Sequence, residues 1–458
     1  NNATDLWTGA VPIESQPDWA ISSQGPQVSA SNGSAVVVWT MYGPGSEPYS
    51  VFVNRYTAGA WGTEADIDFT YGTTELADNP TVTLDPTGNA TIVFDQSQVV
   101  SSGPAPASLV TVRYSALTGG VSLIYFHEYR TLGEGAPVVA GNLAGDVFIA
   151  WTYNEGTATD PINGIVAMPY TISGGWGYPQ QAEWDQNVQP SWLALESNAA
   201  GDAIYTWTQW NGLVWDGYAA LYTPRSGWGT PTKIENFHAS GATEEWSAID
   251  GQGNAMVLFR ASNGTQYNVY ATYYSVQSGW GSPVRLDNAA GSGKYWLRVA
   301  LNRVGNGVAC WQEYNGVGWN AYTAFFNGTT QTWSAPVVVQ TAFSYVYAVV
   351  VGIDAHGNAA AVFGAWNGTG DANYGSYYQP GVGWGTPVLL NRHSLYPGES
   401  YFLASNDQGD FAVSWQEWTG SYYSAVASVF TPQGGWSADT FLTSGPGNSG
   451  PATPPHDG

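Results

Sequence analysis

Apolar residues along this chain fall in short runs separated by glycine and polar residues, and the whole arrangement returns every 52 to 57 residues. Each unit has a glycine, then Asn or Asp in most copies, then an apolar run that ends in Trp or Phe six residues after the glycine. The glycines are Gly33, Gly88, Gly145, Gly201, Gly253, Gly305, Gly357 and Gly409, and the aromatic residues are Trp39, Phe94, Trp151, Trp207, Phe259, Trp311, Phe363 and Trp415. Such regular self-similarity indicates a repeat architecture with one core position per unit.

Each unit is typical of four short β-strands. An apolar stretch leads to an Asn or Asp three residues before the glycine, the pattern of a type I turn. The next strand is apolar on both faces, which indicates that both faces are covered. A hairpin leads to a third strand, and a fourth follows Gly-Trp, as in "GWGTPTKI". No apolar period of 3.6 residues is present, so the sequence predicts an all-β, eight-bladed β-propeller of four-stranded antiparallel blades.

The propeller is expected to span residues 16–443, with an extra strand in residues 1–15 and a Pro/Gly-rich tail over 444–458. The segment "WTGAVPI" (7–13) resembles the fourth strand "WGTPVLL" (384–390). It would either latch the last blade or pair with a second molecule, and the tail is a second candidate for self-association.

The stretches "YSVFVNRYTAGAWG" (50–62) and "DAHGNAAAVF" (354–363) carry a wider resemblance. They resemble secreted bacterial propeller proteins built from units of the form "GNAxAVW…YxxxxGWG". The resemblance implies the propeller fold and export, and it assigns no catalytic residue.

Charge and cysteine content narrow the function classes. A formal net charge of −24 with two lysines, Lys233 and Lys294, disfavours nucleic acid as a partner and favours cations or neutral polymers. Membrane insertion is not expected, because no apolar run approaches 18 residues. The single Cys310 lies in an apolar strand and is expected to be buried. The composition favours an extracellular protein whose leader has been removed, with no cofactor and no metal site; calcium at the Asp-containing turns is the alternative left open.

The loops between the second and third strands, and between successive blades, are expected to share one variable face. The stretch "WTQWNGLVW" (207–215) predicts a tight hairpin with positive φ at both Asn211 and Gly212. The position nine residues after the repeat glycine is aromatic in five of the eight units. From this position and from the loops between blades come the candidate carbohydrate-stacking rings Trp210, Tyr314, Trp366, Trp418, Trp192, Trp246, Trp296 and Tyr401. Packing between blades is the alternative role for each.

Two carboxylates complete the candidate site. Glu313 and Glu417, from "WQEY" and "WQEW", are expected at strand ends on the variable face. Together with Glu244, Glu245, Glu399 and Asp185 they make a glycoside hydrolase possible, since that chemistry needs two carboxylates. A polysaccharide lyase would instead use His127, His238, His393, Arg130 and Arg392. Three functions remain open: a neutral-glycan-binding protein, a glycan-degrading enzyme on the same face, and a self-assembling surface or filament subunit.

Overall fold

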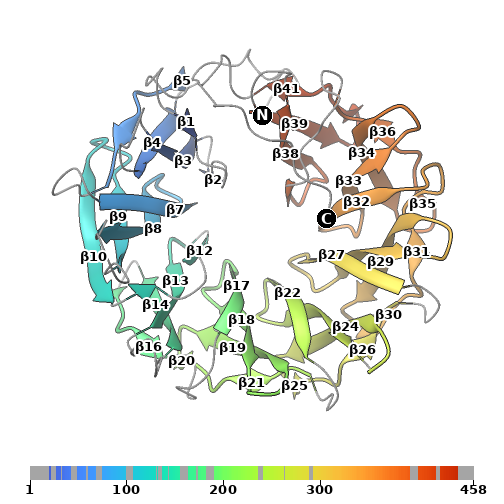
Figure 1. Cartoon of the computed structure of the whole chain (residues 1–458), viewed down its shortest axis with the longest axis horizontal. Helices are drawn as coiled ribbons and strands as arrows, with labels where there is room; N and C mark the ends of the chain where they lie inside the picture. The colour runs from blue at the N-terminus through green and yellow to red at the C-terminus, as the bar shows by residue number, and fades with distance from the viewer. Residues whose placement is uncertain are drawn as a thin grey trace. The chain divides into compact units, whose positions relative to one another are not determined.

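A computed structural model describes residues 20–21, 27–31, 34–42, 49–57, 60–68, 75–98, 107–129, 131–132, 137–142, 144–154, 163–171, 174–181, 190–235, 241–262, 264–287, 292–391, 401–418 and 423–441. None of these residues is helical, and their strands form eight antiparallel sheets. The sheets are the blades of an eight-bladed β-propeller, which confirms the fold predicted from the repeat (Figure 1). The described chain divides into two compact units, residues 13–234 with blades one to four and residues 235–446 with blades five to eight.

The first unit holds twenty-one strands. Blade one comprises β1 (Ala20–Ile21), β2 (Gln27–Ser31), β3 (Ser34–Tyr42), β4 (Tyr49–Thr57), β5 (Ala60–Trp61) and β6 (Ala65–Asp66). Blade two comprises β7 (Glu75–Leu84), β8 (Ala90–Gln98), β9 (Ala107–Tyr114) and β10 (Val121–Tyr129). Blade three comprises β11 (Thr131–Leu132), β12 (Val138–Gly141), β13 (Val147–Asn154), β14 (Asn163–Thr171), β15 (Gly175–Trp176) and β16 (Gln180–Gln181). Blade four comprises β17 (Pro190–Ser197), β18 (Ala203–Trp210), β19 (Trp215–Thr223), β20 (Gly227–Trp228) and β21 (Thr232–Lys233).

The second unit holds the remaining strands. Blade five comprises β22 (Ala242–Ile249), β23 (Ala255–Ser262), β24 (Tyr267–Ser275), β25 (Gly279–Trp280) and β26 (Val284–Arg285). Blade six comprises β27 (Ser292–Leu301), β28 (Gly307–Tyr314), β29 (Trp319–Asn327), β30 (Thr332–Trp333) and β31 (Val337–Val338). Blade seven comprises β32 (Val346–Ile353), β33 (Ala359–Trp366), β34 (Asp371–Gln379), β35 (Gly383–Trp384) and β36 (Val388–Leu389). Blade eight comprises β37 (Phe402–Ser405), β38 (Phe411–Trp418), β39 (Tyr423–Thr431), β40 (Gly435–Trp436) and β41 (Thr440–Phe441).

The outer strand of most blades is split in two. In blade seven, for example, β35 and β36 both pair with β34, and the segment "GTP" separates them. Blade two has Val121 in place of the Gly-Trp aromatic residue, and its outer strand β10 runs unbroken over nine residues. The split outer strands all begin with a pair that ends in Trp, as in Ala60–Trp61, Thr332–Trp333 and Gly383–Trp384, so this tryptophan accompanies the break.

The turns between the first two strands match the predicted chemistry. In blade seven, Asp354 Oδ1 accepts hydrogen bonds from the backbone N–H groups of His356 and Asn358, both at 2.8 Å. Gly357 has a φ of 84°, a conformation that glycine adopts without strain. The side chain of the Asx residue therefore holds its own turn.

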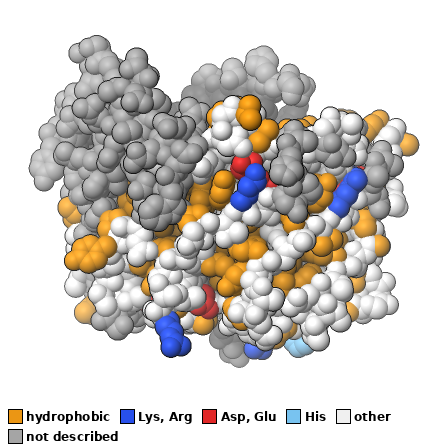
Figure 2. Space-filling model, turned by 90° about the horizontal axis from the view of Figure 1, so that it is seen from below, with side chains coloured by type: hydrophobic (Ala, Val, Ile, Leu, Met, Phe, Trp, Pro, Cys, Tyr) orange, Lys and Arg blue, Asp and Glu red, His pale blue; other side chains and the backbone are white. Residues whose placement is uncertain are grey.

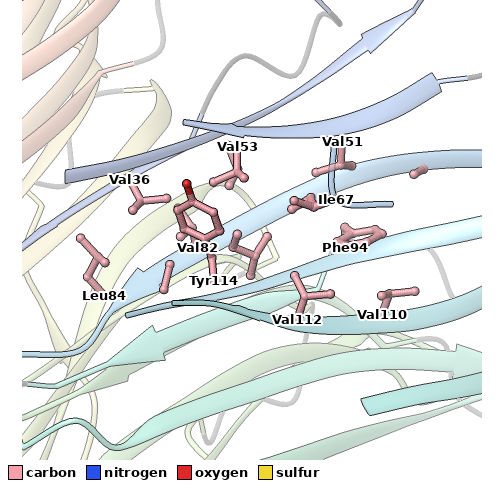
Figure 3. Close-up of a cluster of buried hydrophobic side chains, with 14 residues drawn as sticks. Val36, Val51, Val53, Ile67, Val82, Leu84, Phe94, Val110, Val112 and Tyr114 are labelled. Carbon is pink, nitrogen blue, oxygen red and sulfur yellow. The ribbon is translucent and has the colours of Figure 1, made fainter. Parts of the chain in front are cut away.

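All eight aromatic residues at the repeated core position are buried, between 0 and 3% exposed. Apolar side chains of neighbouring blades fill the space around them. One such cluster joins β3 and β4 to β7, β8 and β9 and includes Val36, Val53, Val82, Phe94 and Val112 (Figure 3). Cys310 is also fully buried, as predicted, and burial raises the pKa of its thiol to about 12.

The inner strands begin earlier than the sequence pattern predicted. Segments expected as loops between successive blades contain the starts of β7, β22 and β27, most of β10 and all of β11. In β7, β22 and β27 a bulge interrupts the ladder near this start, as between Tyr295 and Arg298. A bulge adds a residue and breaks the alternation of inward and outward side chains, which hides the strand in the sequence. The N-terminal segment 1–15 and the tail 444–458 lie outside the described residues.

Candidate functional site

The hairpins between the second and third strands have longer loops than predicted. In blade six, β28 and β29 are joined by four residues, Asn315 to Gly318, and only Gly316 among them has a positive φ, at 94°. Asn315 Oδ1 accepts hydrogen bonds from the backbone N–H groups of Val317 and Gly318, both at 3.0 Å. The hairpin of blade four has the same loop, in which Asn211 Oδ1 accepts hydrogen bonds from the backbone N–H groups of Leu213 and Val214 at 2.9 and 3.0 Å. Gly212 has the predicted positive φ, at 93°, but the prediction for Asn211 was wrong, because the Asn side chain caps a four-residue loop in place of a two-residue turn.

This loop length places a second large side chain opposite the predicted one. Tyr314 pairs with Trp319 across the hairpin of blade six, and their ring centroids are 5.5 Å apart. Trp210 pairs in the same way with Trp215 in blade four, at 5.8 Å. Each of these hairpins thus ends in a pair of aromatic side chains. Only Trp210 and Tyr314, on the second strand of each blade, were predicted from the sequence.

Further aromatic rings of blades five and six lie next to the Tyr314–Trp319 pair. The Tyr295 ring lies 5.8 Å from the Trp319 ring. The guanidinium of Arg260 lies 4.8 Å from the centroid of Tyr295 and 4.7 Å from that of Tyr267. Arg260 Nη1 also donates a 2.8 Å hydrogen bond to the backbone oxygen of Lys294, which fixes the cation between the two rings.

The loop before β32 connects these rings to blade seven. The backbone N–H of Trp319 donates to Ser344 O, and that of Trp366 donates to Tyr345 O, both at 3.0 Å. Trp319 and Tyr345 form a parallel β-bridge. Backbone hydrogen bonds therefore tie the hairpins of blades six and seven to one loop.

We call this set of residues the aromatic platform: Tyr267, Tyr295, Tyr314, Trp319, Tyr345 and Trp366. Four of its rings are 42–45% exposed, namely Tyr267, Tyr295, Tyr345 and Trp366. Tyr345 and Trp366 also take part in the backbone hydrogen bonds of this region, and the exposed part of each ring is available to a ligand.

A carboxylate adjoins the platform in blade seven. Asp371 is the cross-strand partner of Trp366, and its side chain is hydrogen-bonded to Tyr347. Burial raises the pKa of the Asp371 carboxyl, and the hydrogen bond from Tyr347 lowers it. An exposed indole beside a carboxylate offers stacking and a hydrogen-bond acceptor in one place.

Glu313 and Glu417 are not exposed at strand ends. They are 3% and 0% exposed, and they accept hydrogen bonds from the indole nitrogens of Trp311 and Trp415, at 2.8 and 3.3 Å. Glu313 Oε1 also lies 4.0 Å from Nζ of the fully buried Lys294, which is 3.2 Å from Asp287 Oδ2. Burial raises the pKa of the Glu313 carboxyl, while Trp311 and Lys294 lower it.

The rings predicted from the loops between blades pack inward where the structure describes them. Trp246 lies under the Arg298 guanidinium at 3.6 Å and contacts the core of blades five and six. Trp296 packs against two core clusters of the second unit, and the Tyr401 hydroxyl donates a 2.6 Å hydrogen bond to Asn373 Oδ1. The side chains of Trp192, Trp418, Glu244, Glu245 and His127 are not among those described, and Asp185, His238, Glu399, His393, Arg130 and Arg392 lie outside the described residues.

Six residues of this region were not predicted from the sequence: Tyr267, Tyr295, Trp319, Tyr345, Arg260 and Asp371. Tyr267, Trp319 and Asp371 each lie fourteen residues after the repeat glycine of their blade. A four-residue hairpin loop places this residue opposite the one nine residues after the glycine, so counting along the repeat could have found these three. Within the described parts of the chain, no three His, Cys, Asp or Glu side chains are grouped so as to hold a metal ion. No helix long and apolar enough to span a membrane occurs there either.

Comparison with known proteins finds only distant similarity to solved structures. No protein-family model matches this chain, and no characterised protein matches it by sequence. Among solved structures, an ulvan lyase of polysaccharide lyase family PL25 is similar, with 11% identity, a TM-score of 0.45 and coverage of 89% of this chain and 92% of that one. The polysaccharide lyase Uly1 has 12% identity, a TM-score of 0.41 and coverage of 80% and 91%. The α-L-arabinanase of Penicillium chrysogenum, solved with arabinobiose, has 13% identity, a TM-score of 0.39 and coverage of 66% and 93%.

Proposed function

We propose that this protein binds neutral carbohydrate through the aromatic platform. The observation that carries the proposal is the set of exposed and partly exposed rings on blades five to seven, from Tyr267 through Trp319 to Trp366. Sugar rings stack their apolar C–H faces on such side chains, and nearby polar groups bind the hydroxyls. Asp371 supplies such a group beside Trp366.

Rigid placement of the rings supports the same function. Backbone hydrogen bonds hold Trp319 and Tyr345 together, and Arg260 separates two tyrosines at a fixed spacing. A ligand that binds to a preformed surface pays less ordering entropy, which favours useful affinity from a few stacked rings. The length of the platform favours a chain of several sugar units over a single sugar.

Binding is better supported than catalysis. The two carboxylates predicted for hydrolysis, Glu313 and Glu417, are buried and engaged by indole N–H groups. Low charge over much of the surface fits a neutral ligand, and Figure 2 shows one face on which few charged side chains lie among apolar and uncharged polar ones. We extend the proposal to an extracellular location, which the composition and the resemblance to exported propellers support.

The test is calorimetric titration with neutral oligosaccharides of glucose, xylose and mannose. Trp366→Ala and Trp319→Ala are expected to weaken binding at least tenfold, while Leu117→Ala, a fully exposed apolar residue of blade two, leaves it unchanged. Reducing ends are assayed in the same samples, and their release would favour the enzyme alternative. Equal affinity of the wild type and both Trp variants would refute the platform.

A further inference from the structure

A second feature suited to a ligand lies between the outer strands of blades six and seven. It is a groove of about 790 Å³, bounded by β29 and β31 on one side and by the segment Gly383–Pro387 on the other. Phe325, Tyr378 and Trp384 form its aromatic wall. The volume lies within the usual range for small-molecule sites, about 300–1,000 Å³.

The aromatic wall is rigid. The Phe325 and Tyr378 rings stack with centroids 4.0 Å apart, and Tyr378 lies 5.4 Å from Trp384. Trp384 Nε1 donates a 2.9 Å hydrogen bond to Thr323 Oγ1, which fixes the indole. Three interlocked rings therefore present a fixed apolar surface along the groove.

One polar side chain of the groove has an unmet hydrogen bond. Gln340 lines the groove and is 6% exposed. Its Oε1 accepts a 2.9 Å hydrogen bond from the backbone N–H of Phe343, but its Nε2 has no acceptor among the described residues. Buried amide donors are usually satisfied, so this N–H group is free to donate to an acceptor on a ligand in the groove.

The groove beside it is built in the same way. A smaller hollow of about 210 Å³ lies between blades seven and eight and shares Gly383, Gly385 and Thr386 with the first. Trp436 lines it, and the indole N–H of Trp436 also has no acceptor among the described residues. Gly375 is required there, because a Cβ on it would lie 2.5 Å from the Trp436 ring. An aromatic wall with an unpaired N–H donor therefore occurs on both sides of Gly383–Pro387.

The chemistry of the lining defines the ligand. Among the residues that the structure describes, no Asp, Glu, Lys, Arg or His lines either groove. The exposed rim carries hydroxyl groups, among them Thr341 and Thr386. An uncharged ligand with an apolar face and oxygen acceptors at its edge meets these conditions, and a sugar unit has both.

We propose that the groove between blades six and seven is a second carbohydrate-binding site, in which a sugar unit stacks on the aromatic wall and accepts a hydrogen bond from Gln340 Nε2. The choice of a neutral sugar rests in part on the proposed function. The loop from Gln340 to Tyr345 leads from this groove to the aromatic platform, so one oligosaccharide-binding protein would contact its ligand at two separate places. Two weak sites on one molecule raise the avidity for a polymer without any new contact.

The experiment reads each site separately. Chain labelled with ¹⁵N is titrated with neutral tetrasaccharides of glucose, xylose and mannose, and the side-chain N–H signals of Gln340 and Trp384 are followed by NMR. Thr341→Trp fills the rim of the groove from an exposed position, and Thr329→Trp, exposed in the turn between β29 and β30, is the matched control. Melting temperatures establish that both variants fold.

At least one tetrasaccharide is expected to shift the Gln340 and Trp384 signals saturably at millimolar concentration. The shifts should persist in Thr329→Trp and in Trp366→Ala, and Thr341→Trp should weaken this binding at least tenfold. Absence of any shift in the wild type, or full persistence in Thr341→Trp, overturns the proposal. If the groove signals respond while Trp366→Ala leaves total binding unchanged, the groove stands and the platform fails.

Discussion

The indole nitrogen of Trp311 donates a 2.8 Å hydrogen bond to Oε2 of Glu313, two residues further along β28. The same offset joins Trp207 to Gln209 at 3.0 Å and Trp415 to Glu417 at 3.3 Å. Where Phe replaces Trp at this core position in blades five and seven, the residue two positions on is a buried alanine, Ala261 or Ala365. In blades four, six and eight an acceptor thus accompanies the indole N–H, which would otherwise be buried without a partner. Blades one and two differ, because Met41 follows Trp39, whose indole nitrogen has no partner among the described residues, and a buried Gln96 follows Phe94.

Substitution of Glu313 tests this role. Glu313→Gln keeps an oxygen acceptor for Trp311 and leaves Lys294 paired with Asp287, so we expect a loss of about 1 kcal/mol in the free energy of unfolding. Glu313→Ala removes the acceptor and one charge partner of a buried lysine, and we expect a loss of about 3–5 kcal/mol. Urea denaturation of both variants measures the difference, and equal losses would show that the hydrogen bond to Trp311 contributes little.

The carboxylates show why the fold was easier to predict than the site. The repeat determines which aromatic residue faces the core, because one position must pack between blades in every unit, and all eight positions are buried as predicted. Glu313 has no such signature. A glutamate at the end of an apolar strand is usually exposed, and its burial here follows from the tryptophan beside it and from Lys294 on the neighbouring strand.

The platform residues depended on information that periodicity does not contain. Trp319 is opposite Tyr314 only because the hairpin loop has four residues, and a two-residue turn would have paired different side chains. Tyr295 and Arg260 meet through a bulge in β27 and a contact between blades. Loop length, bulges and packing between repeats place these residues, so the repeat predicted the face but not its members.

The pH dependence of stability should report on Asp95. Burial raises the pKa of this carboxyl to about 7 from its ordinary 3.8; a hydrogen bond from Asn79 lowers it, and the nearby charge of Asp78 raises it. Because the folded state binds the proton more tightly than the unfolded state, Asp95 stabilises the fold below about pH 4, and this contribution is lost as the pH rises to about 7. Asp95→Asn cannot ionise, so the wild type should lose stability relative to this variant across that window, by at most about 1.4 kcal/mol per pH unit. Chemical denaturation at several pH values measures it, and a constant difference would contradict the raised pKa.

Substitution at the repeated core position should show how much its packing contributes to stability. Phe363 is fully buried and its ring packs 6.1 Å from that of Tyr374. We expect Phe363→Ala to cost about 3–5 kcal/mol, because it removes buried area and leaves a cavity. Val317→Ala, at an exposed hairpin tip in the adjacent blade, should leave the urea midpoint unchanged. Similar midpoints for the two variants would mean that this position carries little of the core.

Two glycines offer a matched test of platform rigidity. Gly318 and Gly370 occupy the same place in the hairpin loops of blades six and seven. A Cβ on Gly318 would lie 2.2 Å from Ser344 O, the oxygen that accepts the hydrogen bond from Trp319, whereas a Cβ on Gly370 would meet nothing within 4 Å. Neither glycine has a positive φ, so alanine strains neither backbone by itself.

Gly318→Ala should therefore push the loop at Ser344 and Tyr345 away from Trp319 and separate the rings that a glycan chain would bridge. We expect oligosaccharide affinity to fall at least tenfold in Gly318→Ala and to stay at the wild-type level in Gly370→Ala, as measured by calorimetric titration. Neither Ser344 nor Tyr345 belongs to the buried cluster that includes Val346 and packs against Phe343, so the melting temperature should change little in either variant. If both variants bind as the wild type does, the spacing between Trp319 and Tyr345 does not matter for the ligand, and the rings act independently.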